Sequence, residues 1–233
     1  MKFYKEIAIH YDDIFPVKSS VIEFIANRTP PKGNVLDVGC ATGSHGIELS
    51  KLGYQVKGVD ISKEMIEIAK DKSVGLSNIS FATQDIFALD EESCYDTIIC
   101  IGNTLPHFTS LEEIKDVLTK FKKMLKHGGK VIVQTVNYDR VLKQKTDSLP
   151  TITNKNLKFI REYSFNGGLI DFNTILKVGR GNFKNSVKLY PLTSKNIEEL
   201  LAKLKYSTLE FYGGFDESNF NIASFHMVLD CTL

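Results

Sequence analysis

Two aspartates stand at the ends of two short apolar runs, and a glycine-rich turn follows the first of them. Asp37 lies in the run Val35-Leu36-Asp37-Val38, and Asp60 follows residues 55–59 about twenty residues later. An acid at the first place can hold an ammonium group, and an acid at the second is placed to bind ribose hydroxyls. The two acids therefore predict a ligand with a ribose and an amino-acid end.

The turn between these acids has an informative glycine spacing. Gly39 and Gly43 let the backbone bend sharply and approach a ligand, since neither carries a Cβ atom. A dinucleotide site would need the pattern G-x-G-x-x-G, whereas this chain has Gly39, Gly43 and Gly46, with Ala41 in the middle position. The spacing therefore fits a dinucleotide poorly. The alternatives are a tight turn without a ligand, and an N-cap or a solvated strand end for each acid.

Residues 34–136 alternate between short β-branched runs and amphipathic helical patterns, which is typical of βαβ units on a parallel sheet. Strands are predicted at 35–38, 55–59, 79–83, 97–101 and 130–136. Helices are predicted at 44–52, after the cap residue Ser62, and from the capping box of Ser110 and Glu113 to Gly128-Gly129. The fold class is therefore α/β.

The pattern changes after residue 136 to antiparallel strands at 157–165, 169–178 and 183–190, joined by turns that contain glycine. These strands predict a small inserted sheet. A helix capped by Thr193 or Ser194 follows, and then two strands at 206–212 and 222–231. At 233 residues, one domain with an elaboration is expected.

The charge balance is close to neutral, with 29 basic and 28 acidic residues and a formal net charge of +1. Binding to a phosphate backbone usually requires a basic chain, so no nucleic-acid partner is expected. The four cysteines lack the paired spacing of a metal site and suit a reducing compartment, so no metal is predicted. Without a secretion signal or an apolar run that could span a bilayer, the sequence predicts a cytoplasmic protein with no membrane partner.

Three pieces of the sequence, in order, resemble the class I (Rossmann-like) methyltransferases that use S-adenosylmethionine. They are V-L-D-V-G-C-A-T-G, G-V-D-I-S and Gln84-Asp85-Ile86, and the resemblance covers residues 34–136. It implies a doubly wound, seven-stranded sheet, mostly parallel with an antiparallel last strand, and S-adenosylhomocysteine as product. Within a single domain at 1–233, it predicts lid helices at 1–33, a cofactor-binding core at 34–136, an inserted substrate cap at 139–190 and a C-terminal helix with two strands at 191–233.

The resemblance also implies the cofactor contacts. Residues 39 and 41 would line the methionine part, residues 60 and 61 the ribose, and residues 85 and 86 the adenine, whose exocyclic amine Asp85 would meet. The full implied set is Tyr11, Asp37, Gly39, Cys40, Ala41, Gly43, Asp60, Ile61, Met65, Asp85, Ile86, Ile101 and Gly102.

The loop after residues 97–101 is where a methyl acceptor is expected, since polar groups appear there abruptly. Its sequence, I-G-N-T-L-P-H-F, and the run Asn137-Tyr138-Asp139 resemble small-molecule N-methyltransferases of the glycine and sarcosine type. The Asp/Asn-Pro-Pro-Tyr/Phe run of enzymes that methylate bases in nucleic acids is absent here. Val136 stands where the glycine-type enzymes have the arginine that binds the substrate carboxylate. Glycine is therefore a substrate only if Arg140, Arg161 or Arg180 takes over.

The candidate catalytic residues are Tyr11, Asn103 and His107. Methyl transfer is a direct displacement, so an enzyme mainly aligns the partners and excludes water. His107 could accept a proton from an amine or only shape its loop. Tyr11 lies in a segment, 4–16, that resembles the lid helix of the group and would close over the cofactor's methionine end. Its alternative is an ordinary aromatic residue at helical spacing from Tyr4 and Ile7.

The inserted strands are predicted to roof the acceptor pocket, or alternatively to form a sheet edge or an oligomer contact. The expected substrate contacts are Asn103, His107, Tyr138, Arg161 and Tyr163, with Phe159 and Phe172 as further lining residues. The whole reading predicts methylation of a nitrogen, or less readily an oxygen, of a small metabolite by a monomer or small homo-oligomer. A tRNA or rRNA methyltransferase and a non-catalytic S-adenosylmethionine-binding module are the alternatives.

Overall fold

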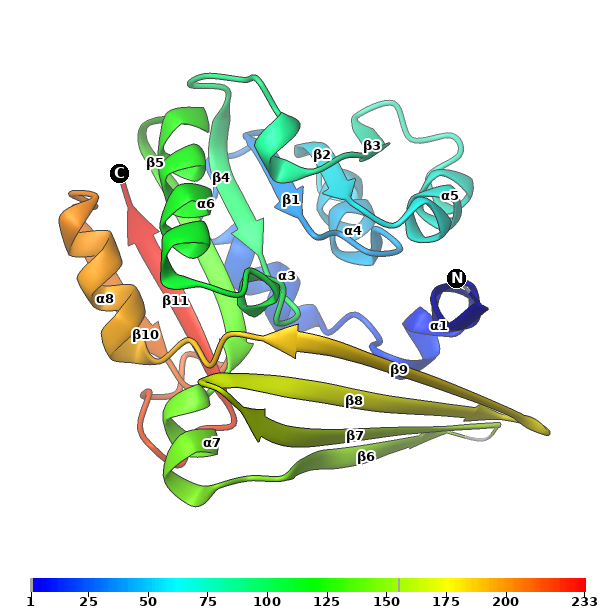
Figure 1. Cartoon of the computed structure of the whole chain (residues 1–233). Helices are drawn as coiled ribbons and strands as arrows, with labels where there is room; N and C mark the ends of the chain where they lie inside the picture. Colours follow the sequence, from blue (N-terminus) through cyan, green and yellow to red (C-terminus); the bar gives the residue numbers. More distant parts are fainter. Residues whose placement is uncertain (1, 155) are drawn as a thin grey trace.

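The computed structural model describes residues 2–154 and 156–233, with side chains from Lys5 onward, so the side chain of Tyr4 lies outside the described residues. The chain forms a seven-stranded sheet flanked by helices and a separate four-stranded sheet (Figure 1). This arrangement confirms the predicted α/β, Rossmann-like fold with an inserted antiparallel sheet. Within the described residues, no helix is both long and apolar enough to cross a membrane.

The larger sheet has the strand order β10-β11-β5-β4-β1-β2-β3. Strands β1 to β5 pair in parallel, and β11 is antiparallel to both β5 and β10, which confirms the predicted antiparallel last strand. The strands are β1 Asn34–Val38, β2 Gln55–Asp60, β3 Ile79–Thr83, β4 Tyr95–Cys100, β5 Leu125–Val136, β10 Thr208–Tyr212 and β11 His226–Thr232. Because the strand order reverses between β1 and β4, a crevice is expected at their carboxyl ends.

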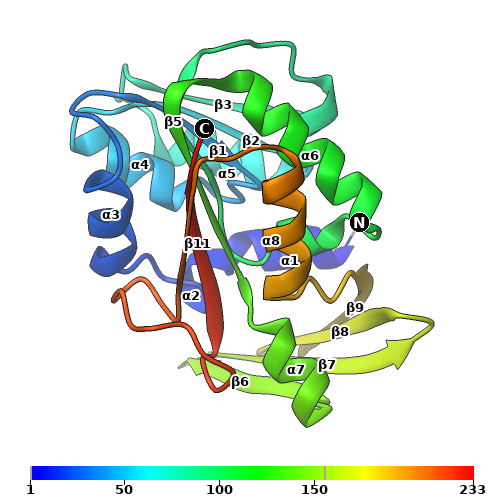
Figure 2. The ribbon, with the colours of Figure 1, turned by 90° about the vertical axis from the view of Figure 1, so that its left-hand side faces the viewer.

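Helices cover both faces of this sheet (Figure 2). Apolar side chains of α3 and α4 pack on one face, and those of α6 and α8 pack on the other. The helices are α3 Ser19–Ala26, α4 Ser44–Lys51, α5 Lys63–Lys72, α6 Leu111–Met124 and α8 Ser194–Lys203, with α5 beside β2 and β3. The predicted N-caps Ser62, Ser110 and Thr193 each accept a hydrogen bond from a backbone N–H of the first turn. The carboxylate of Glu113 accepts from the N–H of Thr109 and not from that of Ser110.

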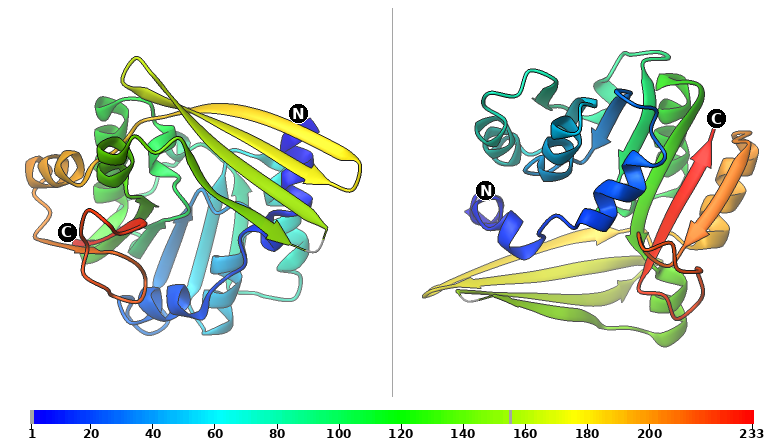
Figure 3. Two further views of the ribbon diagram at one scale, coloured as in Figure 1. Left: turned by 90° about the horizontal axis from the view of Figure 1, so that it is seen from below. Right: turned by 180° about the vertical axis from the view of Figure 1, so that it is seen from behind.

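The segment after β5 forms the four-stranded sheet, called the cap below. Helix α7 (Tyr138–Gln144) leads into β6 Ser148–Asn154, β7 Leu157–Asn166, β8 Leu169–Val178 and β9 Gly181–Leu189, which pair in sequence order. The sequence predicts three of these strands and misses β6. Pro150 and the polar residues around it do not form the pattern of a strand. An edge strand such as β6 nevertheless tolerates proline. The cap crosses the end of the larger sheet at which β1, β4 and β5 finish (Figures 1 and 3).

Several predicted boundaries are wrong, and the largest differences lie around the starts of β5 and β11. Helix α6 ends at Met124 rather than at the glycine pair, because Leu125 already pairs with Tyr95 as the first residue of β5. The helical period of apolar residues continues through Leu125, so the pattern alone does not reveal this change. Strand β11 begins at His226 rather than at residue 222, because the side chain of Asn137 donates hydrogen bonds to two carbonyl groups of the preceding loop.

Residues 2–15, called the strap below, run between the cap and α5 (Figure 1). The strap contains α1 Lys2–Ile9 and α2 Tyr11–Ile14; α1 contacts α5 and β9, and α2 contacts β6. Ile7 and Ile14 pack in one cluster with Met65 and Phe159. Helix α3 packs on the sheet, so the strap is the part of the predicted lid region that is inserted between the two sheets. Movement of the strap as a lid stays a prediction.

Candidate functional site

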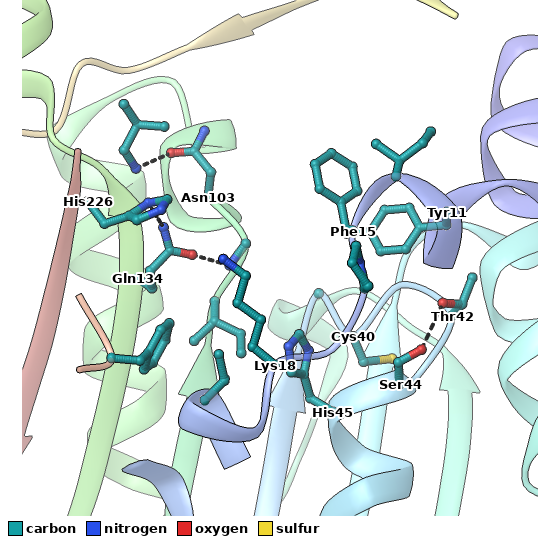
Figure 4. Close-up of a pocket in the computed structure, with 18 of the residues that line it drawn as sticks. Tyr11, Phe15, Lys18, Cys40, Thr42, Ser44, His45, Asn103, Gln134 and His226 are labelled. Atoms are coloured by element: carbon teal, nitrogen blue, oxygen red, sulfur yellow. Dashed lines mark hydrogen bonds between the residues drawn. The ribbon is translucent and has the colours of Figure 1, made fainter. Parts of the chain in front are cut away.

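Two adjoining cavities lie between the carboxyl ends of β1, β4 and β5 and the cap. The first cavity has a volume of about 420 Å³ and the second about 240 Å³. Both are lined by Tyr11, Phe15, Gly102, Asn103, Val136 and Arg161. Figure 4 shows the first cavity, with the strap and the turn after β1 on one side and β5 and β11 on the other.

Asp37 and Asp60 form an acidic pair beside the first cavity. Asp37 lines this cavity, is 2% exposed, and its Oδ2 atom has no hydrogen-bond partner among the described residues. The two carboxylate oxygens of Asp60 accept hydrogen bonds from the N–H groups of Ala41 at 2.9 Å and Ser62 at 2.8 Å. Burial, and then the charge of Asp60, raise the pKa of Asp37 to about 7. A buried carboxylate without a partner is a place for a cationic group of a ligand.

The glycines of the turn after β1 are required by the protein's own packing. Gly39 and Gly43 have φ values of +73° and +75°, which side chains rarely tolerate. A Cβ atom on Gly39 would also lie 2.4 Å from Cγ2 of Thr104, and one on Gly43 would lie 2.4 Å from Cζ of Phe81. The sequence predicts glycine at these positions because a ligand approaches the backbone closely. Contact with neighbouring side chains of the protein is a second reason. The turn fits against the loop after β4 and against β3.

The predicted ribose and adenine contacts lie at the edge formed by β2 and β3, outside both cavities. Strands β2 and β3 pair up to Asp60 and Thr83, so the segments that follow them are neighbours. Ile61 is 79% exposed and Phe87 is 45% exposed, whereas Ile86 is buried. Asp85 caps the short helix η1 (Ile86–Ala88) by accepting a hydrogen bond from the N–H of Phe87 at 2.9 Å. The exposed side chains leave an apolar surface beside Asp60.

Asn103 fixes the loop after β4, where the sequence predicts the methyl acceptor. Its backbone is left-handed, with φ of +68°. Its Oδ1 accepts from the N–H of Val136 at 3.0 Å, and its Nδ2 donates to the Tyr138 hydroxyl at 3.0 Å. Tyr138 is fully buried behind Asn103 and lines neither cavity. The structure therefore places Asn103 in the loop after β4 at both cavities and Tyr138 behind it, where Tyr138 supports Asn103 and, contrary to the prediction from the sequence, does not line a cavity.

Three histidines border the cavities. His107, in the short helix η2 (Leu105–His107), is open to the second cavity, and desolvation by the surrounding protein lowers its pKa although Asp60 partly offsets this. His45 and His226 line the first cavity, and burial is the largest cause that lowers the pKa of each to about 4. Nδ1 of His226 lies 2.9 Å from Nε2 of Gln134 on the neighbouring strand. All three imidazoles are therefore neutral near pH 7.

Tyr11 brings the strap to both cavities. Burial raises the pKa of its hydroxyl well above the usual value, and the charges of Asp60 and Asp37 raise it further. The ring also packs on Phe15, with 5.1 Å between centroids. Tyr11 therefore lines both cavities near the acidic pair and is also a packed aromatic residue. Its closing over the methionine end of a cofactor stays a prediction.

The strap is attached to the turn after β1 through Asp12. Its Oδ1 accepts hydrogen bonds from the hydroxyls of Thr42 at 2.6 Å and Ser44 at 2.7 Å, and its Oδ2 pairs with Lys72 of α5. Those bonds lower the pKa of Asp12 although partial burial opposes them. Asp12 therefore holds the strap closed beside the acidic pair.

The cap supplies the far wall of the second cavity. Phe159, Arg161, Tyr163 and Phe172 line it, as do Met65 and His107 from the larger sheet's side. The sequence missed several lining residues of the first cavity, namely Lys18, Thr42, Ser44, His45, Gln134, Phe215, Phe225 and His226. Thr42, Ser44 and His45 stand in or next to the glycine-rich turn, so their position in the sequence is a signal that they line the cavity. The others come from distant segments that only the folded sheet brings together.

Comparison with known families identifies the chain. A family model described as a methyltransferase domain matches residues 30–206. The chain belongs to this family. Together with its fold and its relatives, this makes it a class I methyltransferase that uses S-adenosylmethionine.

Proteins similar to this methyltransferase include two N-methyltransferases and a methyltransferase of known structure. A glycine/sarcosine N-methyltransferase of Aphanothece halophytica is 30% identical over 86% of this chain and 77% of that protein. A glycine/sarcosine/dimethylglycine N-methyltransferase of Actinopolyspora halophila is 29% identical over 79% of this chain but only 33% of that protein. A crystal structure of an S-adenosylmethionine-dependent methyltransferase from Clostridium acetobutylicum superposes with a TM-score of 0.84 at 20% identity, covering 99% of this chain and 98% of that chain.

The site of this methyltransferase fits its cofactor. The unpaired Oδ2 of Asp37 offers a buried acceptor to an ammonium group, and the exposed Ile61 beside Asp60 offers apolar surface to a nucleoside. Of the cofactor residues expected from the sequence, those that line a cavity are Tyr11, Asp37, Gly39, Cys40, Met65, Ile101 and Gly102. Ala41, Gly43, Asp60, Ile61, Asp85 and Ile86 do not line a cavity and lie in the turn after β1 or along the β2–β3 edge.

Proposed function

We propose that this methyltransferase methylates a nitrogen, or less readily an oxygen, of a small metabolite. The observation that carries the proposal is the second cavity, about 240 Å³ in volume, which Asn103 and His107 border from the β4 side and the cap borders from the other. A pocket of this size suits a small acceptor. The names of the two N-methyltransferase relatives support nitrogen as the accepting atom.

The residues of the two cavities have separate proposed roles. Asp37 would hold the amino-acid end of the cofactor and Asp60 its ribose, while Tyr11 closes the site from the strap. Bound S-adenosylmethionine supplies a methyl group that its positively charged sulfur activates. The chain's own contribution is to hold the acceptor beside that group and to exclude water, and the cap and the strap provide that cover.

His107 is the proposed proton acceptor. An amine must be neutral to attack, and a neutral imidazole open to the acceptor cavity can accept its proton. Replacing His107 with Asn keeps a polar side chain but removes the base. We expect turnover to fall by about 100-fold on the true acceptor, with a partial recovery at high pH, where the amine loses its proton unaided. Unchanged turnover and an unchanged pH profile would leave His107 with only the role of shaping its loop.

The experiment that tests the proposal is a screen of amine and hydroxyl metabolites with isotope-labelled S-adenosylmethionine, read by mass spectrometry for incorporation of the methyl group. Incorporation into a small amine supports the proposal. Gel-shift binding of tRNA or rRNA fragments would favour the nucleic-acid methyltransferase instead. Calorimetric binding of S-adenosylmethionine without turnover of any acceptor would favour the non-catalytic module. Oligomeric state stays a prediction.

A further inference from the structure

Three cationic side chains gather at the end of the first cavity that lies away from Asp37. Lys18, at the start of α3, and Arg161, on β7, line the cavity, and Lys18 extends toward Gln134 (Figure 4). Arg140, on α7, stacks on Phe225, a lining residue, with its Cζ 4.8 Å from the ring centroid. Among the described residues, no carboxylate forms an ion pair with any of these three cations.

The two arginines have buried N–H groups without partners. Nη2 of Arg161 donates to the carbonyl of Pro150 at 2.6 Å, but its Nε is buried without a partner among the described residues. Nε and Nη2 of Arg140 are likewise buried and without partners there. Such groups are destabilising unless something binds them, because each buried donor has lost its hydrogen bonds to water. Burial accordingly lowers the pKa of Arg161.

The positive charges of Lys18, Arg140 and Arg161 all affect the same residue, His226, which lines the first cavity. Burial is the largest cause that lowers the pKa of His226 to about 4, and the charges of Lys18, Arg140 and Arg161 follow it. The nearest acid on α7, Asp139, accepts a hydrogen bond from the N–H of Ser194 and forms no ion pair with these cations among the described residues. The cavity is therefore acidic at the Asp37 end and basic at the other.

We propose that the acceptor amine carries an anionic group, a carboxylate or a phosphate monoester, which Arg161 binds with the charge of Arg140 behind it. This inference rests on the proposed small-molecule function. A guanidinium with free N–H groups matches the paired oxygens of either anion. Val136, at the end of β5 between the cavities, offers no charge, so the cap supplies the anion-binding group. Arg180 lies exposed in the turn between β8 and β9 and does not line either cavity.

The test uses the protein saturated with S-adenosylhomocysteine and matched pairs of probes. Calorimetry measures the binding of amino carboxylic acids against their primary amides, and of amino-alcohol phosphates against the parent amino alcohols. We expect at least one anionic probe to bind about ten-fold or more tightly than its neutral partner, and the two series distinguish a carboxylate from a phosphate site. Arg161→Gln should abolish the difference, Arg161→Lys should retain part of it, and Arg180→Gln should retain all of it.

Further readouts separate this inference from the proposed function. The affinity for S-adenosylhomocysteine should be the same in the wild type and in Arg161→Gln, and a single cooperative thermal transition should show that the variant folds. Neutral amines that bind and accept methyl groups as well as anionic ones would overturn the inference while leaving the proposed function intact. Anionic probes that never bind, or that bind equally to Arg161→Gln, would also overturn it. Failure of every amine to accept a methyl group, with anion binding retained, would instead contradict the proposed function.

Discussion

The acidic and basic ends of the first cavity are built in different ways. The acidic end comes from Asp37 and Asp60, at the ends of two neighbouring parallel strands joined by one helix. The basic end comes from Lys18, Arg140 and Arg161, which lie on three elements that are far apart in the sequence. The first is part of a compact local unit, whereas the second exists only when the cap folds over the sheet. Changes in the cap can therefore alter the acceptor that a methyltransferase binds, while the β1–β2 unit keeps the same cofactor.

The largest difference should be seen in stability when a glycine in each region is replaced by alanine. Gly39→Ala at the acidic end adds a clash with Thr104 to an unfavourable φ, so we expect a loss of about 3 kcal/mol in the free energy of unfolding. Gly179→Ala in the cap also has a positive φ, +54°, but its Cβ would meet nothing within 4 Å. Its loss should be about 1 kcal/mol. Urea unfolding measures both, and equal losses would contradict the packing argument.

Asp37→Asn removes one of the two carboxylates of the acidic end while keeping the shape of the side chain. The buried Oδ2 would no longer attract a cation, so the Kd for S-adenosylmethionine should rise about 30-fold, equivalent to about 2 kcal/mol. Asp90→Asn, at an exposed position, is the matched control and should leave the Kd unchanged. Calorimetry would contradict the assignment if the two variants bound alike.

The acidic and basic ends also differ in how much of each can be predicted from the sequence. The positions of the core strands along the chain and the acidic pair could be predicted because each depends on a short run. For example, the apolar run Val35-Leu36-Asp37-Val38 predicts the buried strand that the structure shows. The basic end could be predicted only in part. Arg140 and Arg161 are candidate anion binders in the sequence, but Lys18 and these two arginines lie on three elements that come together only in the folded chain. Strand β6 was missed because its pairing with β7, rather than its own pattern, makes it a strand. The resemblance predicts Tyr138 as a substrate contact, whereas in the structure Tyr138 is fully buried and its hydroxyl accepts a hydrogen bond from Asn103.

The strap should close the acidic end through Asp12. Asp12→Asn weakens the bonds to Thr42, Ser44 and Lys72, so bound S-adenosylhomocysteine should dissociate about ten-fold faster, for a loss of about 1.4 kcal/mol. Asp13→Asn is the control, because Asp13 is exposed on the same short helix and its ion pair, with His10, is long at 3.8 Å. Stopped-flow displacement measures both rates. Equal rates would show that the strap does not retain the cofactor.

The pH dependence should be smaller and should come from the acidic end. The pKa of Asp37 is about 7 in the folded ligand-free protein, against an ordinary value of 3.8, so the folded state holds this proton more tightly than the unfolded state. Stability of the ligand-free protein should therefore fall as pH rises from about 4 to 7. Cofactor affinity should rise roughly eight-fold between pH 6 and 8 as Asp37 ionises. Asp37→Asn should flatten both curves, and a wild-type affinity that is independent of pH would contradict this origin.

One calorimetric measurement tests the division of the cavity most directly: titration of S-adenosylmethionine into Asp60→Ala and Arg161→Gln, side by side with the wild type. Asp60 holds the turn after β1 through the N–H of Ala41, and Arg161 comes from the cap. We predict about a 100-fold weaker Kd for Asp60→Ala and an unchanged Kd for Arg161→Gln. Equal losses in the two variants, or a loss in Arg161→Gln alone, would contradict the account.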